Sequence, residues 1–230
     1  KARYLKALDE FEALYGPGQV AVYSAPGRSE ISGNHTDHQH GRVLAAAINL
    51  DAIAFVRKQE GIIKVKSDNY DIAGIDVSDL EKKEAELGTS EGIIRGVVSR
   101  FKELGYQVGG FVAYMTSDVL IGAGLSSSAA FEVLVGTILS YLYNDGAVSA
   151  VEIAKIGQYS ENVYFGKPCG LMDQMASSVG GLVNIDFADT AKPVINPVQV
   201  KFSEFNHSLC IIDTKGSHAD LTPDYAAIPA

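Results

Sequence analysis

The sequence predicts an α+β domain, in which helices and strands follow one another at irregular intervals. Stretches rich in Val, Ile, Phe and Tyr, such as "VAVYSA" at 20–25, are typical of strands. Between them lie longer stretches whose apolar residues recur every three or four positions, which indicates helices. The sequence has no regular strand–helix–strand unit, internal repeat, low-complexity tract or linker. These features favour an α+β fold over a parallel α/β sheet.

The first part of the chain is predicted to be one helix followed by strands. Leu5, Leu8, Phe11 and Leu14 form one apolar stripe, and the Gly-Pro-Gly turn at 16–18 ends the helix. The strands that follow are predicted at 20–25, 43–59 and 62–68.

The rest of the chain is predicted to alternate between helices and strands. Helices are expected at 88–105, 129–144 and 149–165, and strands at 109–119, 182–187 and 208–214. Two glycine-containing loops, 120–128 and 166–174, separate some of these elements. The last residues, 220–230, resemble the start of another helix with Pro223 in its first turn. We therefore expect the 230 residues to be part of a longer protein.

Composition narrows the class of partner. The net charge of −9 argues against nucleic acid or an anionic membrane as the main partner, because an acidic surface repels both. The amphipathic start is not a signal peptide, and no apolar run approaches the ~20 residues of a membrane span. Cys169 and Cys210 alone suggest no disulfide framework. We expect a cytoplasmic protein that binds small molecules.

The loop "GAGLSSSAA" at 122–130 has the features of an anion site. It follows a strand and opens a long apolar helix, where unpaired N–H groups and the helix dipole favour a phosphate. It lacks the lysine of a Walker loop and the last glycine of a dinucleotide fingerprint. A serine that merely caps the helix is the simpler interpretation, yet three serines and two glycines exceed what a cap needs.

The loop "GKPCGLMDQ" at 166–174 carries a second candidate group. Asp173 there is placed to act as a general base, or else to cap the short helix predicted at 174–178. Glu161 lies twelve residues earlier in a predicted helix, either on the surface or turned inward to hold a metal. These residues by themselves leave both alternatives open.

The loop "GNHTDHQHG" at 33–41 raises the possibility of zinc. Zinc needs three or four ligands that converge. In an extended loop His35 and Asp37 point one way, and His38 and His40 point the other. We therefore favour hydrogen bonding by His35 and Asp37, with His38 and His40 at the surface.

Three of these segments resemble one enzyme family in the family's own order. "APGRSEISGNHTDHQHGRVL" resembles the galactokinase signature GRxNxIGEHTDYxxGxVLP, and "GAGLSSSAAFEV" resembles the nucleotide loop of the GHMP kinases. "CGLMDQ" resembles the segment with the catalytic aspartate, and "DTKGSHADLTPDYAAIP" a stretch with a sugar-contacting tyrosine. The resemblance runs from about residue 23 to the end. It implies an ATP-dependent sugar-1-kinase, most closely a galactokinase, which makes galactose 1-phosphate and ADP.

The resemblance also implies a fold and a role for particular residues. The fold is the GHMP N-terminal domain, similar to ribosomal protein S5 domain 2, with a mixed sheet and helices packed on one side. Asp173 would be the catalytic base, and Arg28 would pair with it and stabilise phosphoryl charge. The implied sugar-binding residues are Asn34, His35, Thr36, Asp37, Gly170, Asp173 and Tyr225. The implied nucleotide-binding residues are Ser67, Gly122, Ala123, Gly124, Leu125, Ser126, Ser127 and Ser128. The implied ligands of Mg²⁺ are Ser128, helped by Ser127, and Glu161.

Some positions depart from the family pattern. Asn34 replaces a glutamate, His38 a tyrosine and Ala45 a proline, and the chain has no Trp to lie beside the adenine. The change at Asn34 leaves open a kinase for a related sugar, N-acetylgalactosamine or arabinose. A non-catalytic sensor of galactose and ATP on the same scaffold is a separate alternative, against which the retained Arg28, Glu161 and Asp173 argue. The family's C-terminal domain lies outside these residues, so we expect this piece alone to turn over poorly. Oligomeric state is not predicted.

Overall fold

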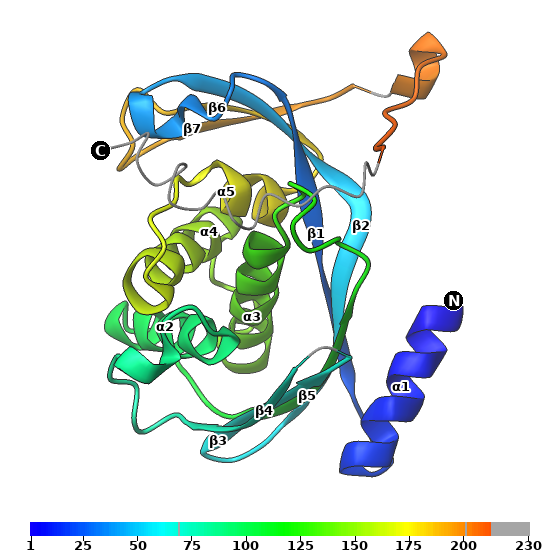
Figure 1. The fold of residues 1–230 in the computed structure, drawn as a ribbon, viewed down its shortest axis with the longest axis vertical. Coiled ribbons are helices and arrows are strands. Elements are labelled where there is room, and N and C mark those ends of the chain that lie inside the picture. Colours follow the sequence, from blue (N-terminus) through cyan, green and yellow to red (C-terminus); the bar gives the residue numbers. More distant parts are fainter. Residues whose placement is uncertain (69, 201, 213–230) are drawn as a thin grey trace.

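The computed structural model describes residues 1–68, 70–200 and 202–212, and one mixed sheet of seven strands runs through them (Figure 1). The strands are β1 (Ala21–Ser32), β2 (Arg42–Lys58), β3 (Ile62–Ser67), β4 (Asp71–Asp76), β5 (Phe111–Ser117), β6 (Leu182–Asp186) and β7 (Val194–Val198). The long strand β2 organises the sheet. β1 pairs along one edge of β2, while β5 and β6 share the other edge. β3 and β4 continue the sheet beyond β5, and β7 continues it beyond β6. Of these pairings, only the one between β3 and β5 is parallel.

Helices cover both faces of this sheet unequally. They are α1 (Ala2–Tyr15), α2 (Ser90–Glu103), α3 (Ser127–Tyr143), α4 (Ala150–Tyr159) and α5 (Met172–Val179), with a π-helical segment η3 (Ser160–Phe165) and short 3-10 turns η1 (Thr36–Gln39), η2 (Glu84–Glu86) and η4 (Phe202–Phe205). Figure 1 shows α2 to α5 grouped on one face and α1 on the other. No helix in the described part of the chain is both long and apolar enough to cross a membrane.

The alternation of side chains along β2 explains the two layers. Ala52, Ala54 and Val56 belong to the main core beneath the helices. Ile53 and Phe55 point to the opposite face, where they pack with Phe11 of α1. The prediction of a mixed sheet with helices on one side is therefore confirmed for α2 to α5, and α1 covers a separate apolar patch.

Most predicted elements are present, with a few differences. Strands β4 and β7 were not predicted, because Gly74 interrupts the first and Asn196 and Pro197 interrupt the second. The helix predicted over 149–165 ends at Tyr159 and continues as the π-helical segment η3. Residues 208–212 form no strand, and the rest of that predicted strand and of the terminal helix lies outside the described residues. β1 runs on to Ser32, beyond the predicted end at residue 25, so the segment directly before the histidine-rich loop is sheet.

Candidate active site

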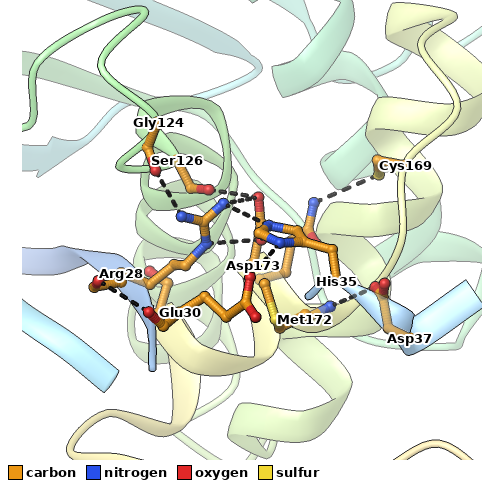
Figure 2. Close-up of polar contacts among 12 residues, drawn as sticks. Arg28, Glu30, His35, Asp37, Gly124, Ser126, Cys169, Met172 and Asp173 are labelled. Atoms are coloured by element: carbon orange, nitrogen blue, oxygen red, sulfur yellow. Dashed lines mark hydrogen bonds and ion pairs between the residues drawn. The ribbon is translucent and has the colours of Figure 1, made fainter. Parts of the chain in front are cut away.

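Arg28 and Asp173 form the centre of the site, although 145 residues separate them in the sequence. Arg28 Nε donates to Asp173 Oδ1 and Arg28 Nη2 donates to Oδ2, both at 2.8 Å. Figure 2 shows this bidentate ion pair where β1, α5 and the start of α3 meet. The guanidinium is buried, and the carboxylate keeps 31% of its side-chain surface exposed. Arg28 is thus held in place by the protein, while part of the Asp173 carboxylate remains accessible to a ligand.

The surroundings of Asp173 keep it ionised. Burial by itself raises the pKa of a carboxyl group, but the charge and the hydrogen bonds of Arg28 outweigh that effect. The Ser126 hydroxyl also donates to Asp173, and His35 adds to the lowering. The pKa of Asp173 therefore lies below its usual value. At neutral pH the group is a carboxylate that can accept a proton from a bound hydroxyl.

Asp173 does not cap its helix. It lies in the first turn of α5, after the N-cap residue Leu171, and its carboxylate faces Arg28. Asp37 satisfies the helix start instead, since its Oδ2 accepts from the backbone N–H groups of Leu171 and Met172 at 2.7 and 3.1 Å. A Cβ at Gly170 would lie 1.8 Å from that oxygen, so only glycine allows this approach. Asp37 and Gly170 also line a hollow of about 350 Å³.

The loop before η1 is held by Glu30, a residue that the sequence interpretation did not include. Asn34 and His35 both have positive φ, 55° and 53°, which is uncommon for residues other than glycine. The Glu30 carboxylate accepts from the backbone N–H of Asn34 and lies 2.6 Å from His35 Nδ1. The Thr36 hydroxyl adds a bond of 2.9 Å to the carbonyl of Gly33. These bonds stabilise a strained turn beside the ion pair.

The three histidines of this loop do not converge. His35 contacts Glu30 and Arg28, His38 Nδ1 lies 3.5 Å from Asp37, and His40 Nδ1 lies 3.2 Å from the carbonyl of Ala188. Among the described residues, no three His, Cys, Asp or Glu side chains are grouped to hold a metal ion. Each histidine of the loop instead has its own contacts with neighbouring side chains or a backbone carbonyl.

Arg28 also ties the serine loop to the centre. Its Nη1 donates to the carbonyl of Gly124 at 2.7 Å, and its backbone N–H donates to the carbonyl of Leu125 at 3.1 Å. Gly122 and Gly124 both have a φ of 73°, a conformation that favours glycine. Ser126 is the N-cap residue of α3, but its hydroxyl donates to Asp173 and accepts no hydrogen bond from the first turn of the helix. Simple capping therefore does not explain this serine.

The serine loop borders a second hollow, of about 250 Å³, on the side away from Asp37. Ser127 and Ser128 line it together with Ser67, which the sequence interpretation assigned to the nucleotide. Its other walls are mainly apolar, from Tyr70, Ile93, Met115, Phe131 and Leu134. Ala123 and Leu125 hold the loop down by packing against an apolar cluster that includes Val119 and Ala130. The structure thus brings three of the predicted nucleotide residues, Ser67, Ser127 and Ser128, to one cavity.

Glu161 lies in a buried acidic cluster behind the ion pair. The amide nitrogen of Gln174 donates to Glu132 Oε2 at 2.9 Å and to Glu161 Oε2 at 3.0 Å. Lys167 Nζ lies 3.3 Å from Glu161 Oε1. Glu132 is completely buried, and burial together with the nearby charge of Glu161 raises the pKa of Glu132 well above its usual value. Two carboxyl groups here share one amide and one cation.

Tyr225, the remaining residue assigned to the sugar, lies outside the described residues.

Comparison with known proteins identifies the family. Residues 9–58 match the galactokinase galactose-binding signature, and residues 92–181 match the N-terminal domain of the GHMP kinases. Galactokinases from Streptomyces coelicolor and Glaesserella parasuis are 32% and 35% identical to this chain, over 94% of it and 56% of their own length. This chain belongs to the GHMP kinase family. It spans about half the length of the curated relatives that it matches.

Solved structures of GHMP kinases show the same fold. Lactococcus lactis galactokinase, solved in complex with galactose, superposes with a TM-score of 0.77 at 25% identity, over 96% of this chain and 59% of its own. Methanococcus jannaschii mevalonate kinase gives a TM-score of 0.68 at 19% identity, over 92% of this chain and 67% of its own. The second likeness, at this low identity, concerns the fold alone.

The side chains of this site are compatible with the magnesium ion that the family implies. Mg²⁺ prefers oxygen ligands and takes most of them from water and substrate phosphates, so one or two protein ligands suffice. Ser128 and Glu161 supply a hydroxyl and a carboxylate, both oxygen donors. The buried Oε1 atoms of Glu132 and Gln174 have no hydrogen-bond partner within the described residues. The cluster therefore has unused oxygen atoms beside the Glu161 carboxylate.

Three residues of the site were missing from the sequence interpretation: Glu30, Glu132 and Gln174. A signal for Glu30 exists, because the galactokinase signature has Asn where this chain has Glu30. Glu132 follows Ser128 by four residues, which places both on one face of α3. Gln174 adjoins Asp173 in the sequence. No local pattern shows that these last two side chains meet.

Proposed function

We propose that this protein is an ATP-dependent galactokinase, which transfers the γ-phosphoryl group of ATP to the anomeric hydroxyl of galactose. The observation that carries the proposal is the ion pair of Asp173 and Arg28, joined directly to the serine loop through Gly124 and Ser126. Galactokinases of 30–35% identity and the galactose-bound structure of the Lactococcus lactis enzyme support the choice of sugar.

In this mechanism Asp173 takes the proton of the anomeric hydroxyl. The freed oxygen then attacks the γ-phosphorus of ATP, and the bond between that phosphorus and the leaving ADP oxygen breaks. Phosphoryl transfer needs positioning and charge neutralisation more than covalent help from the protein. Arg28 serves both needs, since it holds Asp173 and the serine loop at once. When bound beside Ser128 and Glu161, magnesium supplies further positive charge to the phosphates.

The nucleotide base fits the apolar hollow behind the serine loop. Tyr70 and Phe131 meet there edge to face, with ring centroids 5.8 Å apart, and Met115 lies in the same wall. These side chains would hold the adenine in place of the tryptophan that the family pattern has. Ser127 and Ser128 lie at the same hollow and would direct the phosphates toward Asp173.

Galactose-dependent release of ADP by the full-length protein tests the proposal. We expect Asp173→Asn to lower kcat by about 10²–10⁴, the usual contribution of a general base, with a small change in the KM for ATP. Galactose and ATP binding without turnover in the wild type would show a sensor instead. A higher kcat/KM for N-acetylgalactosamine or arabinose than for galactose would show a kinase for another sugar.

A further inference from the structure

Glu30 stands where the galactokinase signature has an amide, and Asn34 stands where the signature has a carboxylate. The signature GRxNxIGEHTD places Asn two residues after the arginine and Glu directly before the histidine. This chain reads GRSEISGNHTD, with Glu30 and Asn34 at those positions. The loop therefore keeps one carboxylate and one amide, with their places exchanged.

The two exchanged positions are neighbours in space. Glu30 is two residues after Arg28 on β1, so both side chains extend from the same face of the strand. The Glu30 carboxylate reaches the backbone N–H of Asn34. A carboxylate at either position thus lies at the same turn, beside the same histidine.

Glu30 also determines which nitrogen of His35 carries the proton. An ionised carboxylate only accepts hydrogen bonds, so His35 Nδ1, 2.6 Å from Glu30, must be the donor. A guanidinium only donates, so His35 Nε2, 3.2 Å from Arg28 Nη2, must accept. This geometry places a proton on Nδ1 of His35, whose ring lies between Glu30 and the Arg28–Asp173 pair. Figure 2 shows Glu30 and His35 beside that pair.

We propose that Glu30 is a positioning residue for sugar binding: it supplies from β1 the carboxylate that the signature places at position 34, and it fixes His35 against Arg28. The role rests on the function proposed above. Only 18% of the Glu30 side chain is exposed, so its hydrogen bonds are partly shielded from water. Its action on the sugar passes through His35 and the turn at Asn34.

The test is a cycle of substitutions in the full-length enzyme, with the KM for galactose and kcat as readouts. We expect Glu30→Met to raise this KM about tenfold, roughly the effect of losing one charge-assisted hydrogen bond, while kcat falls less than threefold. Glu30→Gln keeps one accepting oxygen, so its KM for galactose should lie between those of the wild type and Glu30→Met. Asp186→Leu is the matched control, because Asp186 has 20% exposure and pairs with Arg42 away from the site; its KM should stay within twofold of wild type.

The reciprocal exchange gives the sharper result. Glu30→Asn and Asn34→Glu should each raise the KM for galactose, the second because it puts two carboxylates at one turn. The double variant restores the order of the signature and should return to within about threefold of wild type. If the double variant shows the product of the two single effects, or Glu30→Met leaves the KM within twofold, the role of Glu30 is wrong.

Nitrogen-15 NMR of the His35 ring provides a readout that does not depend on turnover. The wild type should carry its proton on Nδ1, and Glu30→Met should change this. A fall in melting temperature with unchanged KM and unchanged ring protonation would show a merely structural residue. A wild type with no galactose-dependent turnover would overturn the proposed function and the sugar-binding role together, whereas an active wild type with insensitive variants would overturn only the role of Glu30.

Discussion

Asp173 and Glu132 are two carboxyl groups at neighbouring places in the same site, and their protonation differs. Asp173 faces a guanidinium and a hydroxyl, and its pKa lies below the usual value. Glu132 is completely buried, faces one amide and lies near a second carboxyl group, and its pKa lies well above the usual value. Burial acts on both in the same direction, so the partner decides the charge. One group is kept ionised, as the proposed proton transfer requires, and the other is costly to ionise.

The largest effect should come from removing the cation of the ionised region. Arg28→Met leaves Asp173 beside a buried apolar side chain, and loss of one member of a buried pair costs about 3 kcal/mol of unfolding free energy. The pKa of Asp173 should rise at the same time, and kcat should fall. Urea denaturation at pH 7 measures the first effect. The double variant Arg28→Met with Asp173→Leu should recover part of the stability, and a double variant less stable than Arg28→Met would contradict the pairing.

A second, smaller effect should come from removing the charge of Glu132 in the acidic cluster. Because the folded-state pKa of Glu132 is raised, folding binds a proton as pH rises above about 4.3, the unfolded value, so Glu132 lowers stability progressively with pH. Glu132→Gln removes this penalty and should raise Tm at pH 7 by at least about 2–4 °C, the shift expected for ~1 kcal/mol in a domain of this size. At about pH 3, where the carboxyl group is protonated in both states, the difference should vanish. Equal gains at the two pH values would contradict this origin.

The sequence predicted the ionised region better than the acidic cluster, for a physical reason. Arg28 and Asp173 lie in motifs whose composition indicates chemistry, and resemblance assigned them to one another. Gln174 and Glu132 meet through the packing of α5 against α3, and that contact joins residues 42 positions apart. Glu161 was assigned as a metal ligand, but the π-helical turn that presents it has no clear sequence signal. Contacts set by the packing angle of two helices are not encoded in either segment alone.

The fold shows the same limit. Apolar periodicity located α2, α3 and the strand β5 because their buried faces are continuous. The strands β4 and β7 contain Gly74, Asn196 and Pro197, residue types that are depleted in strands, so their own sequences do not define them. Arg28 lies in β1 although the strand was predicted to end at residue 25, since pairing with Ala47 of β2 holds the chain extended there.

The smallest expected effect comes from the hydroxyl of Ser126. It tests whether this hydroxyl, in addition to the guanidinium of Arg28, helps to keep Asp173 ionised. Ser126→Ala removes one donor to Asp173 and should cost roughly 1 kcal/mol at pH 7. Since the pKa of Asp173 is lowered in the folded state, its stabilising effect is present above the unfolded pKa of about 3.9 and is lost as pH falls through the folded value. The cost of Ser126→Ala should therefore shrink in acid, where Asp173 is protonated.

Ser126→Gly is the control, because it removes the same hydroxyl while relieving the positive φ of 57°. Urea denaturation from pH 7 down to pH 2 measures both variants; a cost that stays constant over this range would show that the hydroxyl acts on the loop and not on the charge of Asp173.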